Sequence, residues 1–321
     1  MHRLLVPGLR AAPPPGVDRN ALPRFPALER CYARGRALPA PGRLEELLMG
    51  LFGLEASQGA APFCYLADTG KRPDTGVLRA SPVHLRADRD QVLLFPMDAS
   101  QLNMDEARAL ADGFNGHFAD DGLVIEVPSP HRWYLLTERL PKIPFAALDE
   151  VAGRSLAGFL PGREKAGFWL GVINETQMLF FDSPVNRARE GRGELPVNGL
   201  WFDGAGRLPP TLPGGVRPIH GDHCLLRGLA ACASEPGEDS LVLFGDIQAA
   251  LGAVDAAAWL EAMKRLESLL SPLMKKEDIM LYPCDGRSWH WKPSLNRHFW
   301  RLPRPLRFGG EGPESNQDGI G

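Results

Sequence analysis

The stretch LVLFGDIQAALGAVDAAAWLEAMKRLESLLSPLMKKEDIMLY, residues 241–282, decides the predicted fold. Residues 241–244 are apolar, as in a strand that is buried on both faces of a parallel sheet. Apolar side chains then recur every three or four residues over 255–274, which predicts a long helix. A second apolar run at 278–282 predicts another strand. Strand, helix and strand in this order are typical of an α/β domain.

The rest of the chain extends this core and interrupts it. A strand at residues 3–6 and a strand–helix pair at 218–232 add to a mostly parallel sheet flanked by helices. We expect the chain to divide into an α/β core, an inserted α+β lobe and a disordered tail. The core would take residues 1–79 and 211–308, the lobe residues 80–210 and the tail residues 309–321.

Two local patterns lie shortly before the expected lobe and inside it. Residues 63–67 form a short apolar run, which we interpret as a buried strand. Asn103 is followed three residues later by Glu106, a spacing that predicts a capping box at the start of a helix. Apolar side chains on one side of that helix, ending at Phe118, predict that it packs on a sheet.

A strand with one polar face is predicted over residues 83–88, because apolar residues there alternate with His84, Arg86 and Asp88. Such a face is either solvated or a binding face. The three polar residues are candidates for a site, since two opposite charges and a titratable ring lie together on that face.

Composition excludes several classes of protein. The chain has 321 residues, a net charge of −3 and no basic stripe, so we expect no nucleic-acid partner. Its five cysteines are odd in number and none has CxxC spacing, which argues against a disulfide framework or a zinc site. The start of the chain lacks a signal-peptide core, and no run of about 18 apolar residues occurs. These features predict a cytoplasmic protein with no membrane span.

The densest mix of polar and fixed-geometry residues lies between residues 174 and 208. The tripeptide Pro-Val-Asn occurs there twice, at 184–186 and 196–198, with several arginines between the copies. The guanidinium group of arginine can donate two parallel hydrogen bonds to a phosphate or carboxylate group. The alternative is a surface loop in which each asparagine fixes a turn.

Ten residues are therefore candidates for binding a small anion. Arginines would bind the anion. Asparagines would donate amide hydrogen bonds or fix the loop geometry, and a tryptophan would form one wall of the cleft. The candidates are His84, Arg86, Asp88, Asn174, Glu175, Asn186, Arg187, Arg192, Asn198 and Trp201.

A metal site at His220, Asp222 and His223 is a weaker alternative. Imidazole and carboxylate are suitable ligands. Three ligands so close along one backbone rarely converge on one ion without partners from elsewhere, so we expect no metal there.

Several motifs resemble the proteobacterial family described as the RpfE type of regulatory protein. The resemblance covers nearly the whole chain. It is carried by PVHLRADRD at 82–90, NGHFADDGL at 115–123, RWYL at 132–135, NETQM at 174–178 and PVNGLWF at 196–202. It implies a regulatory role but no defined chemistry.

The order of features is also similar to cofactor-independent phosphoglycerate mutases of the archaeal type, in the alkaline-phosphatase superfamily. The similarity rests on Asn198, Trp201, the turn at 204–206 and the strand, helix and strand of 241–282. It implies an alkaline-phosphatase-like α/β core with an inserted lobe. In that superfamily two divalent metals and a Ser or Thr nucleophile perform phosphoryl transfer.

The chain departs from that superfamily at each position where the resemblance implies a metal ligand. The first strand is followed by Pro-Gly-Leu-Arg at 7–10, without a carboxylate. Gly-Asp-Ile-Gln at 245–248 contains no histidine, and Cys-Asp-Gly stands at 284–286 after the last strand. Asp246 and Asp285 are the carboxylates that remain in these segments, and two carboxylates are too few to hold a pair of metal ions. We expect no metal, no cofactor and no mutase activity.

The favoured hypothesis is a degenerate superfamily member that binds a small phosphate or carboxylate, or a protein partner, in a regulatory role. The alternative is an enzyme with phosphomutase, phosphatase or relocated acid–base chemistry in the cleft between lobe and core. Its acid–base groups would be His84 with Asp88, or Glu175 with Arg187. The aromatic, basic segment from 289 to 307 is either a partner surface or the last edge of the sheet covering itself.

Overall fold

A computed structural model describes residues 1–97, 100–142, 144–160, 162–212, 214–298 and 300–309. The chain forms two compact units. Unit 1 comprises Met1–Leu54, Leu212–Leu226 and Ala233–Gly321, and unit 2 comprises Glu55–Thr211 and Arg227–Cys232. Among the described residues no helix is long and apolar enough to cross a membrane.

Unit 1 is built on a six-stranded mixed sheet with the order β2-β11-β10-β1-β9-β8. The central strand β1 pairs in parallel with both β9 and β10, and β8 is parallel to β9. Only β11 and β2 run antiparallel to their neighbours. The strands are β1 (His2–Leu5), β2 (Arg36–Pro39), β8 (Arg217–His220), β9 (Ser240–Leu243), β10 (Ile279–Tyr282) and β11 (Arg287–Trp291).

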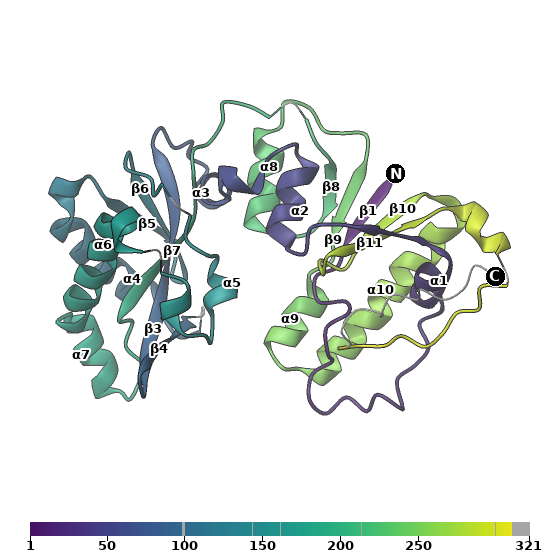
Figure 1. Cartoon of the computed structure of the whole chain (residues 1–321), viewed down its shortest axis with the longest axis horizontal. Helices are drawn as coiled ribbons and strands as arrows, with labels where there is room; N and C mark the ends of the chain where they lie inside the picture. Colours follow the sequence, from purple (N-terminus) through teal and green to yellow (C-terminus); the bar gives the residue numbers. More distant parts are fainter. Residues whose placement is uncertain (98–99, 143, 161, 213, 299, 310–321) are drawn as a thin grey trace. The chain divides into compact units, whose positions relative to one another are not determined.

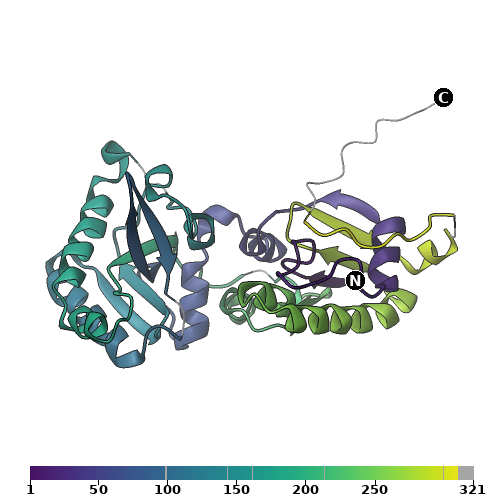
Figure 2. The same cartoon turned by 90° about the horizontal axis from the view of Figure 1, so that it is seen from below.

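Helices cover this sheet because its strands bury side chains on both faces. Leu4 and Leu281 lie in one core cluster with Trp259 of α10, whereas Leu5 is buried but lies outside that cluster. Figure 2 shows α10 running along one side of the sheet. The helices are α1 (Pro26–Arg34), α2 (Leu44–Leu51), α9 (Asp246–Gly252), α10 (Ala256–Lys276), η4 (Pro293–Arg297) and α8 (Cys224–Cys232), which begins in unit 1. The predicted α/β fold with a mostly parallel sheet is confirmed.

Unit 2 is organised around β3, a strand of 13 residues. One edge of β3 pairs with β7, and the other pairs first with β6 and then with β4, all antiparallel. Val77 and Val83 each have a partner on both sides, which fixes β3 in the middle. The strands are β3 (Gly76–Asp88), β4 (Gln91–Pro96), β5 (Val124–Ser129), β6 (Arg132–Thr137) and β7 (Gly199–Gly206).

The longer helices of unit 2 pack against this sheet. Helix α4 lies on β5 and α6 on β7, and α4 also contacts α6 and α7 (Figure 1). Trp169 of α6 and Phe114 of α4 join Trp133 of β6 in one apolar cluster. The helices are η1 (Ala56–Gln58), α3 (Ala61–Thr69), α4 (Met104–His117), η2 (Ala119–Asp121), α5 (Leu148–Val151), η3 (Leu156–Gly158), α6 (Arg163–Phe181) and α7 (Pro184–Gly191).

The predicted strand at 63–67 is wrong, because these residues belong to helix α3. The helix has a proline in its first turn and ends at Gly70, whose φ of 71° suits a left-handed cap. Its residues 61–66 are all buried, so the sequence shows an unbroken apolar run rather than one apolar face. Periodicity alone cannot distinguish such a run from a buried strand.

The start of unit 2 differs from the start of the lobe that the sequence suggested. Residues 55–79 lie in unit 2, whereas the sequence placed them in the core. The reason is that α3 packs on β3 and β7, and the first residues of β3 pair with β6. The long segment of unit 2 ends at Thr211, and the sequence placed the end of the lobe at residue 210. Of the expected tail, residues 310–321 lie outside the described residues.

The predicted capping box starts α4. The Glu106 amide donates to Asn103 Oδ1 at 2.9 Å, and the Asn103 amide donates to the Glu106 carboxylate at 3.3 Å. Two amides that the helix leaves without partners are thereby satisfied.

Replacing Asn103 by alanine should lower the stability of unit 2 by about 1 kcal/mol, because the cap is lost. For a unit of this size the thermal midpoint should fall by roughly 2–4 °C, measured by circular dichroism. Asp112→Ala, on an exposed position of the same helix, is the control and should change stability by less than about 0.5 kcal/mol. Equal midpoints for the two variants would contradict a stabilising cap.

Candidate functional site

The polar face of β3 does not form an acid–base pair. His84 Nδ1 donates to the Pro196 carbonyl at 2.9 Å, and the Arg86 guanidinium lies 4.7 Å from the centre of the Phe95 ring. Asp88 is exposed at the end of the strand. Four residues of strand separate His84 from Asp88 by about 13 Å, so the two side chains do not meet.

The two asparagines of the repeated tripeptide hold backbone segments in place. Asn186 is 2% exposed; it donates to the carbonyls of Phe180 and Val197 at 2.7 and 2.8 Å and accepts the Val197 amide at 2.9 Å. Asn198 accepts the Leu85 amide at 2.6 Å and donates to the Leu85 carbonyl at 2.9 Å. These bonds fix α7 and the start of β7, so neither amide is directed at a ligand.

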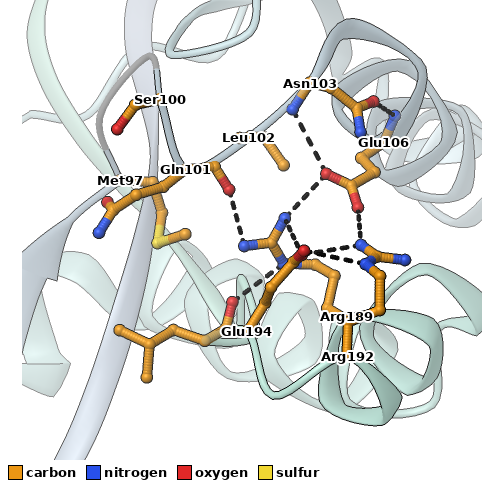
Figure 3. A pocket seen from close by; sticks show the side chains of 10 residues that line it. Met97, Ser100, Gln101, Leu102, Asn103, Glu106, Arg189, Arg192 and Glu194 are labelled. Carbon is orange, nitrogen blue, oxygen red and sulfur yellow. Dashed lines mark hydrogen bonds and ion pairs between the residues drawn. The ribbon is translucent and has the colours of Figure 1, made fainter.

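Arg192 lies at a cavity of about 460 Å³ in unit 2, together with the buried Arg189. Figure 3 shows both guanidiniums directed at Glu106 and Glu194. Arg192 donates to Glu106 at 2.6 Å and to Glu194 at 2.8 and 2.9 Å, and these bonds raise the pKa of Arg192 and lower that of Glu194. An anion would have to displace two carboxylates from Arg192.

Arg189 completes a structural cluster at this cavity. Its guanidinium donates to Glu106 at 2.8 Å and to the carbonyls of Gln101 and Leu195 at 2.7 and 2.9 Å. Glu106 therefore joins the cap of α4 to the end of α7. The cluster ties two helices together, and its arginines are already partnered.

The remaining candidates do not line the cavity beside Arg192. Glu175 pairs with His117 at 3.0 Å, not with Arg187. Asn174 and Arg187 are exposed on α6 and α7. Trp201 is 1% exposed and donates to the Ala146 carbonyl at 2.9 Å, so it is a core residue and does not wall a cleft. The structure does not gather the ten candidates into one site.

A different cluster forms in unit 1, where the carboxyl ends of the parallel strands meet. Loops after β1, β9 and β10 bring together side chains that are far apart in the sequence. Ligands of open α/β sheets bind at this edge. A cavity of about 510 Å³ lies there, lined by Gly8, Arg10, Ala11, Gln248, Pro283, Cys284, Asp285, Arg287 and Gly309.

Two carboxylates at this edge form ion pairs with arginines. Arg10, after β1, donates to Asp285, after β10, at 2.7 Å. Asp246, after β9, pairs with Arg265 of α10 at 2.9 Å. Gly8 has a φ of 78°, and a side chain there would meet Gln248 Oε1 at 2.8 Å, so glycine is needed where this loop turns.

The residues present do not fit a two-metal centre. Each carboxylate at the edge is bound by an arginine, and a divalent cation would need several carboxylate or imidazole ligands. Within the part of the chain that the structure describes, no three His, Cys, Asp or Glu side chains lie close enough to hold a metal ion. This includes the alternative set of His220, Asp222 and His223.

Cys284 lies in this cavity with an unusual backbone, φ 60°. Burial and, secondly, the neighbouring Asp285 carboxylate raise the pKa of Cys284 to about 12. The group is therefore a thiol at neutral pH, and a thiol is a poor nucleophile.

A serine and a histidine meet at the opposite edge of the sheet. Ser240 Oγ lies 2.5 Å from His2 Nδ1, and His2 Nε2 lies 3.7 Å from Glu277. Ser240 is only 4% exposed, so its hydroxyl is not accessible to a substrate. The arrangement serves to join β1 to β9.

No family model matches the chain. Two curated proteins are similar in sequence. The probable 2,3-bisphosphoglycerate-independent phosphoglycerate mutase of Geobacter sulfurreducens is 24% identical over 162 residues, which cover 48% of this chain and 40% of that protein. The 2,3-bisphosphoglycerate-independent phosphoglycerate mutase of Methanosarcina barkeri is 24% identical over 123 residues, covering 36% and 29%. The chain spans less than half the length of these relatives.

The chain is distantly similar to cofactor-independent phosphoglycerate mutases. Two solved structures are also similar. The PH0037 protein from Pyrococcus horikoshii has a TM-score of 0.49 and 14% identity, and the match covers 90% of this chain and 87% of that chain. The cofactor-independent phosphoglycerate mutase from Thermoplasma acidophilum has a TM-score of 0.38 and 17% identity, and the match covers 91% of this chain and 89% of that chain. None of these four proteins is described as RpfE-type, so that resemblance stays a prediction.

Asn186→Ala should lower the free energy of unfolding by about 3 kcal/mol, because it leaves a buried amide and two carbonyls without their partner. The neighbouring exposed Arg187→Ala should change it by less than about 0.5 kcal/mol. Urea unfolding followed by tryptophan fluorescence measures both. If Asn186→Ala left stability unchanged, the asparagine would not hold the loop.

Cys284 should react slowly with iodoacetamide at pH 7.5 in the folded protein. With its pKa raised to about 12, its thiolate fraction is lower than that of an unfolded cysteine by on the order of a thousandfold. Asp285→Asn should speed the reaction, because the carboxylate that helps to raise the pKa is gone. Peptide mass spectrometry follows the modification of Cys284 itself. Rapid labelling of the native thiol would contradict this assignment.

Proposed function

We propose that this chain is a degenerate relative of the phosphoglycerate mutases that binds a small phosphate or carboxylate without metal-dependent turnover. The binding site is the cavity at the carboxyl ends of β1, β9 and β10. The observation that carries the proposal is the ion pair between Arg10 and Asp285, 2.7 Å apart, at this edge.

Charge balance supports an anion rather than a cation. Where the resemblance implies a carboxylate after the first strand, this chain has Pro-Gly-Leu-Arg at 7–10, and Arg10 is the charged residue of that segment. Arg10 neutralises Asp285, and Arg287 also lines the cavity. Among the described residues no ion pair is found for the Arg287 guanidinium, which leaves its fork to bind an oxyanion.

The alternative, an enzyme with relocated acid–base chemistry, has less support. It requires His84 to act with Asp88 or Glu175 with Arg187, and these residues have other partners or positions. The proposal retains the regulatory role implied by the RpfE-type motifs, a cytoplasmic location and a possible protein partner, as the sequence predicts.

Metal content tests the proposal. Elemental analysis of the purified protein should find well under one equivalent of divalent metal, and micromolar Mn²⁺ or Zn²⁺ should not raise the thermal midpoint. Millimolar inorganic phosphate should raise it, and Arg287→Ala should abolish the phosphate effect, because binding to the folded state stabilises it. Two equivalents of metal, or stabilisation of several degrees by metal, would contradict the proposal and would favour metal-dependent phosphoryl transfer as the function.

A further inference from the structure

Unit 1 contains a second and larger cavity, of about 1060 Å³, beside the proposed site. Arg10 and Arg287 line both cavities. We propose that the larger cavity binds the body of an organic acid with an aromatic ring, while its acid group lies on the arginines. This inference rests on the proposed function, since it names the class of ligand.

Aromatic and apolar side chains form one wall of the cavity. The rings of Tyr32 and Trp289 meet edge to face at 4.6 Å, and the Arg10 guanidinium lies 5.4 Å from the Trp289 ring. Leu306 and Phe308 line the cavity as well, and Phe308 packs on Trp259. Small-molecule sites typically measure roughly 300–1,000 Å³, so this space suits a ring-bearing molecule rather than a bare phosphate.

The segment RLPRPLRF, residues 301–308, forms the other wall. Figure 1 shows it, in yellow, as an extended segment that follows η4. Contacts hold it at both ends: Arg34 donates to the Arg301 carbonyl at 3.1 Å, and the Gly309 amide donates to the Arg10 carbonyl at 3.1 Å. The wall is therefore a defined part of unit 1.

The arginines of this segment recur every third residue, at 301, 304 and 307. All three are exposed, whereas Pro303 and Leu306, also three apart, are half-buried. A period of three is that of an extended, proline-rich chain. We infer that the guanidinium groups lie in one row along the rim, with Pro303 and Leu306 toward the cavity.

The rim carries positive charge that its own residues do not neutralise. The lining carboxylate, Glu29, is 3% exposed and is held by Arg24 at 2.5 and 2.7 Å. No ion pair is found for Arg287, Arg304 or Arg307 within the described ranges. Forked guanidiniums without carboxylate partners favour a carboxylate, sulfonate or phosphate group.

The hydroxyl of Tyr32 supplies an independent observation. It is buried, and the described residues offer it no hydrogen-bond partner. Buried polar groups are nearly always partnered, so a ligand atom that reaches this hydroxyl by displacing part of the cavity wall would complete it. Burial raises the pKa of Tyr32, so the hydroxyl keeps its proton and can donate to the acid group.

Fluorescence titration with anilinonaphthalene sulfonate, an aromatic acid, tests the inference on the full chain. The dye should bind, and the double variant Arg304→Ala/Arg307→Ala should raise its Kd about tenfold or more. The control Arg108→Ala/Lys142→Ala removes the same charge from exposed positions of unit 2 and should leave Kd within about twofold. Uncharged phenylnaphthylamine should bind at least about tenfold more weakly than the acid.

Tyr32→Phe provides a second test with opposite effects on stability and binding. Without ligand its thermal midpoint should equal or exceed that of the native chain, because a buried, unpartnered hydroxyl is removed. Its dye Kd should rise by about threefold to tenfold. A lower midpoint would show that the hydroxyl has a partner within the protein and would remove this support.

The outcomes separate this inference from the function on which it rests. Equal binding of the charged and uncharged dyes, or dye binding unaffected by the double variant, would overturn the inference. Phosphate binding without dye binding would also overturn it but would leave the proposed function intact. If neither phosphate nor the dye bound, both the inference and the proposed function would be contradicted.

Discussion

The parallel pairing of β1 between β9 and β10 is the constraint on which the site depends. Leu5 at the end of β1 is in register with both Leu243 and Tyr282. The next residues continue the ladders, with the Val6 amide bonded to the Tyr282 carbonyl and the Phe244 amide bonded to the Leu5 carbonyl, both at 2.8 Å. Three loops must therefore begin at one place, whatever residues they carry.

The residues in those loops decide what this edge can bind. Carboxylates and imidazoles there would attract divalent cations, whereas an arginine repels them. Arg10 both adds a positive charge and holds Asp285. The fold does not depend on this ion pair, because the sheet and helices around Trp259 pack through apolar side chains. An α/β scaffold can thus keep its architecture while the chemistry of its edge changes.

Regular elements could be predicted because their signals are local. The spacing of apolar residues gave α10, and the Asn103–Glu106 spacing gave the start of α4. Helix α3 was missed because it is buried on all sides, so its residues show no period. Unit 2 starts before the expected lobe for a related reason: α3 joins unit 2 through packing on β3 and β7, which no local pattern reveals.

The candidate site was harder to predict, because contacts between distant residues determine what a polar side chain does. Asn186 and Arg192 have the chemistry of ligand binders, yet one holds Val197 and the other is held by Glu194. The sequence did show that residues 7–10 lack a carboxylate and that Asp285 follows the last strand. It could not show that Arg10 and Asp285 bind each other across 275 residues. Tyr32 was missed altogether, since only the folded chain reveals its buried hydroxyl.

The most direct test of the account is anomalous X-ray scattering from crystals of the protein soaked in manganese. The account predicts no anomalous peak at the carboxyl ends of β1, β9 and β10, with Arg10 still bound to Asp285. Two peaks about 4 Å apart at that edge, with Arg10 displaced, would contradict it and would indicate a two-metal centre for phosphoryl transfer.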